Sequence, residues 1–182
     1  MIRPLAVASM LAMIVMLSSA PAAAQKPQWA AGFEMGLSIS STGGGETVQF
    51  NPATGRFDTK SSGAKAGFVF GPTGEVVFSK AYGIRTAFFI GTQAGTPIEW
   101  QNVFRYYFLI KGSNIKPYAH AGFSLIFITG GPYVAIPFGG GALFPVAKNV
   151  YIPADLTFGP IFGGGTTVFG VQIKGGIRYF FD

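Results

Sequence analysis

His120, the one histidine of this sequence, and Ser124 are a pair of side chains whose types could support nucleophilic catalysis. They are four residues apart, and at about 3.3 Å per residue in a strand this spacing places them roughly 13 Å apart. A histidine at that distance cannot take the proton of the serine hydroxyl directly. The pair therefore predicts no catalytic dyad, and we expect no enzyme.

Metal, phosphate and nucleic-acid chemistry are also poorly supported. The chain has no cysteine and one histidine, so we expect no metal site. The glycine triplets at 43–45, 139–141 and 163–165 are not followed by the helix or the Lys-Ser/Thr pair of a phosphate-binding loop. The basic residues are scattered rather than clustered. We therefore expect neither a cofactor nor a nucleic-acid partner.

The composition favours contact with lipid. Hydrophobic residues make up 49% of the chain, aromatic residues 15% and charged residues only 11%, against about 25% charged in soluble domains. Residues 1–24 combine Arg3, an apolar run and a small-residue end, which is the layout of a secretory signal peptide. We expect cleavage after Ala24, which leaves residues 25–182 as one domain. A retained anchor helix is the alternative, although the apolar run is shorter than the roughly 20 residues of a span.

The rest of the chain is unsuited to crossing a membrane as helices. Its longest stretch without a charged residue, 121–147, contains Pro132, Pro137, Pro145 and a glycine triplet, which break helices. A closed β-barrel instead pairs every backbone group between strands. Its signature is the alternation of apolar and polar residues.

That alternation is present. In residues 32–40, Phe33, Met35, Leu37 and Ile39 alternate with small or polar residues. The same pattern predicts seven further strands, at 64–78, 82–92, 98–111, 115–128, 133–146, 150–158 and 169–181. We therefore expect an all-β fold, an eight-stranded antiparallel up-and-down transmembrane β-barrel. A soluble lipocalin-like carrier is the alternative fold.

An even number of strands places both ends of the barrel chain on one side. The connections on that side, at 79–80, 111–114 and 147–149, are predicted to be short turns, and the long segment 42–63 lies on the other side. This difference matches the short periplasmic turns and longer outer loops of bacterial barrels.

Three short segments resemble a known family: 78–85 (FSKAYGIR), 116–122 (KPYAHAG) and 176–181 (GIRYFF). Together they are similar to the small outer-membrane β-barrel proteins of Gram-negative bacteria, the group that holds OmpX, OmpW and the OmpA membrane domain. The resemblance implies location in the bacterial outer membrane, contact with its lipid and lipopolysaccharide, and a C-terminal strand read by the barrel-assembly machinery. In the family that strand ends on an aromatic residue, whereas here Asp182 follows Phe181.

An eight-stranded barrel has an interior just wide enough to be filled by side chains. Buried charges must be paired, and we expect Glu34 to pair with Lys174 or Arg178, and Glu99 with Arg85 or Arg105. The pattern predicts a lumen plugged by charges and a structural or surface-interaction role. The alternative is a narrow channel for ions or small solutes, opened when an ion pair exchanges partners. The charged residues that alternation places inside are Glu34, Arg85, Glu99, Arg105, Lys116, Asp155, Lys174 and Arg178.

Segment 42–63 is the one connection long enough to recognise something outside the barrel. Residues 51–55 (NPATG) form a turn signal, which predicts a hairpin with Glu46 opposite Lys60. Phe50, Arg56 and Phe57 are its candidate contacts for an external partner. A solvated loop without a partner is the alternative.

Overall fold

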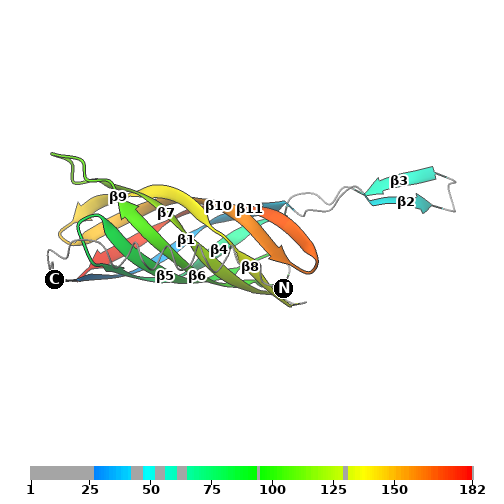
Figure 1. Ribbon diagram of the computed structural model, residues 1–182, viewed down its shortest axis with the longest axis horizontal. Helices are drawn as coiled ribbons and strands as arrows, with labels where there is room; N and C mark the ends of the chain where they lie inside the picture. The colour runs from blue at the N-terminus through cyan, green and yellow to red at the C-terminus, as the bar shows by residue number, and fades with distance from the viewer. Residues whose placement is uncertain are drawn as a thin grey trace, which may run out of the picture.

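The computed structural model is a closed barrel of antiparallel strands (Figure 1). The structure describes residues 27–41, 47–51, 56–60, 65–93, 95–128 and 131–181. The expected signal peptide and its cleavage site lie outside these ranges. No helix among the described residues is long and apolar enough to cross a membrane. The strands are β1 (Gln28–Ser41), β2 (Thr47–Asn51), β3 (Arg56–Lys60), β4 (Lys65–Val77), β5 (Tyr82–Gly91), β6 (Ile98–Tyr107), β7 (Lys116–Ile128), β8 (Gly131–Ala135), β9 (Phe138–Ala147), β10 (Val150–Gly163) and β11 (Thr166–Phe180).

The barrel closes where its first and last strands pair. Neighbours follow chain order from β1 through β4, β5, β6 and β7, then β8 and β9, then β10 and β11. β11 pairs antiparallel with β1, with Leu37 opposite Ile173 and Glu34 opposite Gly176. Because β8 and β9 both lie between β7 and β10, they share the sixth position. The predicted eight-stranded up-and-down barrel is therefore confirmed.

The sixth strand is broken at Pro137. β8 ends at Ala135 and β9 begins at Phe138. Across the break, the Ile136 amide donates to the Pro160 carbonyl at 3.1 Å, and the Pro137 carbonyl accepts from the Gly122 amide at 2.9 Å. Proline has no amide hydrogen and cannot continue the ladder. The predicted strand 133–146 thus exists in two pieces.

The C-terminal ends of two strands differ from the predictions by more than one residue. The strand expected over 98–111 ends at Tyr107. The Phe108 amide donates to the Pro117 carbonyl at 2.8 Å, but Pro117 cannot return a hydrogen bond, and residues 108–115 form a loop. The strand expected to end at residue 158 continues to Gly163. It turns only at Gly164 and Gly165, whose φ angles are +57° and +75°.

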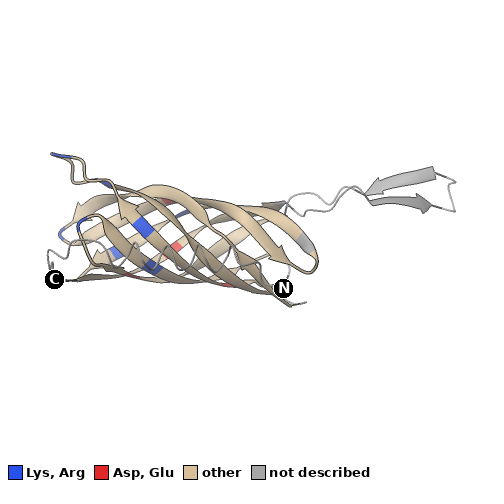
Figure 2. Ribbon diagram, in the orientation of Figure 1, with Lys and Arg blue, Asp and Glu red and all other residues tan. Residues whose placement is uncertain are grey.

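The wall of the barrel has two chemically different faces. Large apolar side chains such as Phe33, Leu37 and Ile173 are 40–58% exposed on the outer face. Ionised side chains occupy the inner face and are almost completely buried. Figure 2 shows these acidic and basic positions among otherwise uncharged strands. The predicted assignment of faces is the one that the structure has.

The segment between β1 and β4 contains the predicted hairpin. β2 and β3 form a separate antiparallel two-stranded sheet, with Phe50 opposite Phe57. Lys60 pairs with Thr47 rather than with Glu46, which lies outside the described residues. The register is one residue away from the predicted one.

One end of the barrel holds the start of β1 and the end of β11, and we call it the C-terminal mouth. β4–β5, β6–β7 and β9–β10 are connected there, at 78–81, 108–115 and 148–149. Loop 108–115 projects from this end in Figure 1, so the connections on this side are not all short turns. At the other end, β10 and β11 are joined by residues 164–165 alone.

Candidate functional site

Among the residues that the structure describes, the lumen holds eight Asp, Glu, Lys and Arg side chains that are each at most 7% exposed. They come from six of the strands and point inward because successive residues of a strand face opposite sides of the sheet. Four are acids and four are bases, so their formal charges cancel. The acids are Glu34 (β1), Glu75 (β4), Glu99 (β6) and Asp155 (β10), and the bases are Arg85 (β5), Arg105 (β6), Lys174 and Arg178 (both β11).

Glu34 bridges two arginines. Its Oε2 lies 2.5 Å from Arg85 Nη2, and its Oε1 accepts a hydrogen bond from Arg178 Nη2. The carboxylate therefore joins β1 to β5 and to β11. Of the two partners expected from the sequence, the structure places Arg178 beside Glu34.

Glu75 is a second bridging acid, and it is absent from the residues predicted for the lumen. Its Oε2 accepts hydrogen bonds from Arg178 Nη1 at 2.6 Å and from Arg105 Nη1 at 3.0 Å, and its Oε1 accepts one from the Tyr107 hydroxyl. The alternation of the strand contained the signal, because Phe68 and Phe70 mark the outer face and residue 75 belongs to the opposite one. With Glu75 included, acids and bases are equal in number.

Asp155 is surrounded by donors. Tyr118 donates to its Oδ2 at 2.9 Å and Thr157 donates to its Oδ1 at 2.6 Å. Lys174 Nζ lies 3.4 Å away and Arg105 Nη2 3.7 Å away. Arg105 also stacks over the Tyr118 ring, with 4.1 Å between its Cζ and the ring centroid. This carboxylate therefore holds the part of the lumen between β6, β7, β10 and β11.

Glu99 is held by amides. Its Oε1 accepts from Gln101 Nε2 at 3.1 Å and its Oε2 from Gln172 Nε2 at 2.8 Å. Arg85 and Arg105, the partners expected for it, bind Glu34, Glu75 and Asp155 instead. The predicted pairing of Glu99 with Arg85 or Arg105 is therefore wrong.

The contacts form a closed circuit around the lumen. Gln101 joins Glu99 to Arg85, whose Nη1 donates to Gln101 Oε1 at 2.6 Å. On the other side, Lys174 donates to Gln172 Oε1 at 2.8 Å, and Gln172 returns to Glu99. In order, the circuit runs through Glu99, Gln101, Arg85, Glu34, Arg178, Glu75, Arg105, Asp155, Lys174 and Gln172.

Lys116 is the predicted lumen residue that lies outside this circuit. It is only partly buried and sits at the C-terminal mouth. Its Nζ lies 4.7 Å from the centroid of the Tyr151 ring and 5.0 Å from that of Phe180. The aromatic faces therefore provide the contact for this ammonium group.

His120 and Ser124 both lie in the lumen on β7 and are buried. His120 Nε2 lies 3.2 Å from the Thr157 hydroxyl, and its Nδ1 lies 3.4 Å from Asp155 Oδ2. Among the described residues, the Ser124 hydroxyl has no hydrogen-bond partner. In the parts of the chain that the structure describes, no group of three or more His, Cys, Asp and Glu side chains is placed to hold a metal ion.

The outer-loop residues Phe50, Arg56 and Phe57 lie on β2 and β3. The structure describes their backbone pairing and not their side chains. Their role as contacts stays a prediction.

Comparison with known proteins gives structural neighbours but no sequence relatives. No protein-family model matches the chain, and no curated protein matches it. The Neisserial surface protein A barrel superposes with a TM-score of 0.63 at 15% identity, over 86% of this chain and 100% of that one. The N-terminal β-barrel domain of OprF from Pseudomonas aeruginosa gives 0.56 at 11% identity, over 87% and 99%.

The chain has the fold of the small outer-membrane β-barrels. A de novo designed transmembrane β-barrel matches as well, with a TM-score of 0.53 at 13% identity, over 87% of this chain and 99% of the design. At these identities the agreement is one of architecture. The function has to be argued from the chain's own residues.

Proposed function

We propose that this chain is an integral protein of the bacterial outer membrane. The observation that carries the proposal is the division of faces: apolar side chains cover the outside of the barrel, while the buried charges are enclosed and held by ion pairs or hydrogen bonds. Water would solvate such an outer face poorly, whereas acyl chains match it. The same arrangement disfavours a soluble carrier, in which the apolar residues would line the lumen.

An aromatic band at the C-terminal mouth supports this assignment. Trp29, Tyr106 and Tyr179 lie near the strand ends there and are 40–61% exposed. Amphipathic aromatic rings concentrate where the hydrocarbon core meets the headgroups. The long connection between β1 (ending at Ser41) and β4 (beginning at Lys65) lies at the opposite end, and bacterial barrels keep their long loops outside. We therefore assign the C-terminal mouth to the periplasm, which places lipopolysaccharide around the opposite end.

Export and assembly complete the proposal. Cleavage after Ala24 would leave residues 25–182, and the barrel-assembly machinery would read the last strand through Phe181 and its neighbours. The role we assign to the folded barrel is structural or surface-interacting and involves no catalysis.

We propose that the circuit of charges blocks the lumen to the passage of ions. Each of its carboxylates is held by at least two donors, and the cavity beside Glu99 and Gln172 measures only about 40 Å³, which is room for little more than water. A hydrated ion would have to separate ion pairs to pass. The narrow channel is the alternative, in which partner exchange opens such a path.

Planar-bilayer recordings separate the plug from the channel. We expect the native protein to be silent and Glu34→Ala to produce brief openings, because this change leaves Arg85 and Arg178 without the carboxylate between them. Phe33→Ala, which faces outward beside Glu34, is the matched control and should stay silent. Regular openings of the native protein would establish the channel instead.

The hairpin of β2 and β3 is proposed to carry any contact with an external partner. It forms its own sheet, separate from the barrel, so it can be removed without touching barrel pairing. Deleting residues 48–58 should leave the heat-modifiable gel migration of a folded barrel unchanged and abolish adhesion of expressing cells to host surfaces. Adhesion that survives the deletion would transfer this role to another loop.

A further inference from the structure

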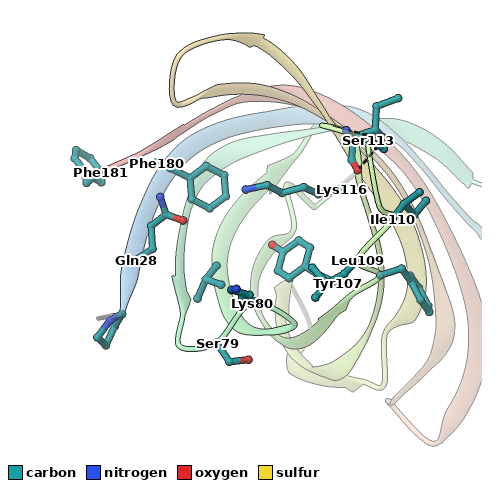
Figure 3. Close-up of a pocket in the computed structure, with 14 residues that line it drawn as sticks. Gln28, Ser79, Lys80, Tyr107, Leu109, Ile110, Ser113, Lys116, Phe180 and Phe181 are labelled. Carbon is teal, nitrogen blue, oxygen red and sulfur yellow. Dashed lines mark hydrogen bonds between the residues drawn. The ribbon is translucent and has the colours of Figure 1, made fainter. Parts of the chain in front are cut away.

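The C-terminal mouth contains a cavity that the charged circuit does not use. It measures about 550 Å³, within the range of small-molecule sites. Val77, Tyr107 and Phe180 contribute from the barrel strands, and loop 108–115 forms a further wall. Figure 3 shows the Lys116 side chain extended toward the Phe180 ring, with Lys80, Tyr107 and Leu109 below them in this view.

The charged residues that the structure describes in the lining of this cavity are both basic. They are Lys80 and Lys116, and none of the described lining residues carries a carboxylate. Lys116 makes ring contacts but no ion pair with the described residues, and Lys80 is exposed. Glu75, the acid that Tyr107 reaches at the base of the mouth, is already bound by Arg105 and Arg178. Two ammonium groups are therefore available to an anion.

The loop supplies an apolar surface next to these charges. Phe108, Leu109 and Ile110 line the cavity, yet they are 47%, 66% and 54% exposed. They follow the last residue of β6 and are not part of the strand face. An apolar surface left open beside unpaired cations is chemically complementary to a molecule with an acyl chain and an anionic head.

We propose that this cavity binds a free single-chain anionic amphiphile, of the fatty-acid class, from the aqueous phase at the C-terminal mouth. The head lies between Lys80 and Lys116, and the chain covers Phe108, Leu109 and Ile110. This site is additional to the membrane role proposed above, because it uses residues outside both the charged circuit and the outer apolar face.

The test uses the full barrel in phosphatidylcholine nanodiscs and the fluorescence of dansyl-undecanoate. We expect saturable binding that laurate displaces and that dodecanol and dodecyltrimethylammonium, its neutral and cationic counterparts, do not. Equal displacement by all three, or no signal above empty nanodiscs, would overturn the proposal. Replacing part of the lipid with phosphatidylglycerol should leave binding unchanged, and loss of binding there would identify a bilayer lipid as the occupant and refute the free amphiphile.

Variants locate the site. Lys80→Gln and Lys116→Gln should each weaken binding about threefold and together about tenfold, and Leu109→Ser should weaken it as well. Lys65→Gln, at the exposed start of β4 on the opposite end, is the matched control and should bind like the native chain. Heat-modifiable migration of every variant shows whether the barrel has folded, so loss of the site is distinguished from loss of the barrel. Unchanged affinity in the double lysine variant would rule the site out.

Discussion

Glu75 shows how a single carboxylate can join distant parts of the barrel. It accepts hydrogen bonds from Arg105 and Arg178, which are 30 and 103 residues away along the chain, and from the Tyr107 hydroxyl. Removing one member of a buried ion pair leaves an uncompensated charge and is more damaging than the net value of the pair suggests. The residue thus supports three side chains at once.

We expect Glu75→Gln to lower the free energy of unfolding by about 3–5 kcal/mol. The amide keeps the shape of the side chain but leaves two buried arginines short of a counter-charge. Denaturant unfolding in lipid vesicles, followed by the fluorescence of Trp29 and Trp100, measures the change. Glu99→Gln is the matched control, because its contacts are to amides, and it should cost about 1 kcal/mol. Equal losses in the two variants would contradict the ion-pair assignment.

The sequence placed seven of the eight buried lumen charges on the inner face but could not pair them all. Alternation decides which side of a strand a residue faces. Which residues meet across the lumen depends on the stagger of the strands, which no local pattern contains. For this reason the sequence predicted the contact between Glu34 and Arg178 but not the contact between Arg85 and Gln101. Glu75 was missed because Gly71, Pro72 and Gly74 dilute the alternation of its strand.

At the level of elements, close approach of backbones limits which residues the strands tolerate. A Cβ atom at Gly36 would lie 2.7 Å from Lys174 Cα, and closer still to the Ile173 carbonyl, across the pair that closes the barrel. Backbone atoms there cannot swing aside as a flexible side chain can. The glycine is therefore required by the spacing between β1 and β11.

Gly36→Ala should destabilise the barrel by about 1–3 kcal/mol, the usual range for overpacking a tight site. Gly74→Ala is its control, since a Cβ there would find its nearest neighbour, Thr86 Cγ2, at 3.7 Å, an ordinary contact. The folded fraction after refolding into detergent, read from heat-modifiable migration, compares the two. A Gly36→Ala chain that refolds as well as the control would show that β1 and β11 can move apart.

The presence of each barrel strand could be predicted from the sequence, whereas the residues at which the strands end were predicted less accurately. Period-2 alternation identified all eight barrel positions, because each strand has an apolar outer face and a more polar face toward the lumen. Turn signals were less reliable, since glycine-rich segments suit both turns and tightly coiled strands. β10 therefore continues through Gly159 to Gly163, past residue 158, where the alternation predicted its end. Prolines set the break at Pro137 and the end of β6 opposite Pro117.

For the whole molecule, the lipid-facing assignment predicts a cost that depends on depth. Ile173 lies in the middle of β11 and is 58% exposed, while Tyr179 lies near its end and is 43% exposed. Ile173→Arg should destabilise the protein in vesicles by about 2–4 kcal/mol, and Tyr179→Arg by about 0–1 kcal/mol. Denaturant unfolding of both variants in the same vesicles measures the difference. Equal and small costs would indicate an outer face in contact with water.

The closed circuit of lumen contacts has a consequence for biogenesis. Its members come from β1, β4, β5, β6, β10 and β11, so a partly assembled sheet presents several of them without their counterparts. An open sheet that entered the hydrocarbon core of the membrane would bring these unpaired charged side chains into it. We infer that the lumen side of the open sheet remains hydrated until β1 and β11 pair. Closure of the barrel and pairing of the buried charges then occur together, as one late step of assembly.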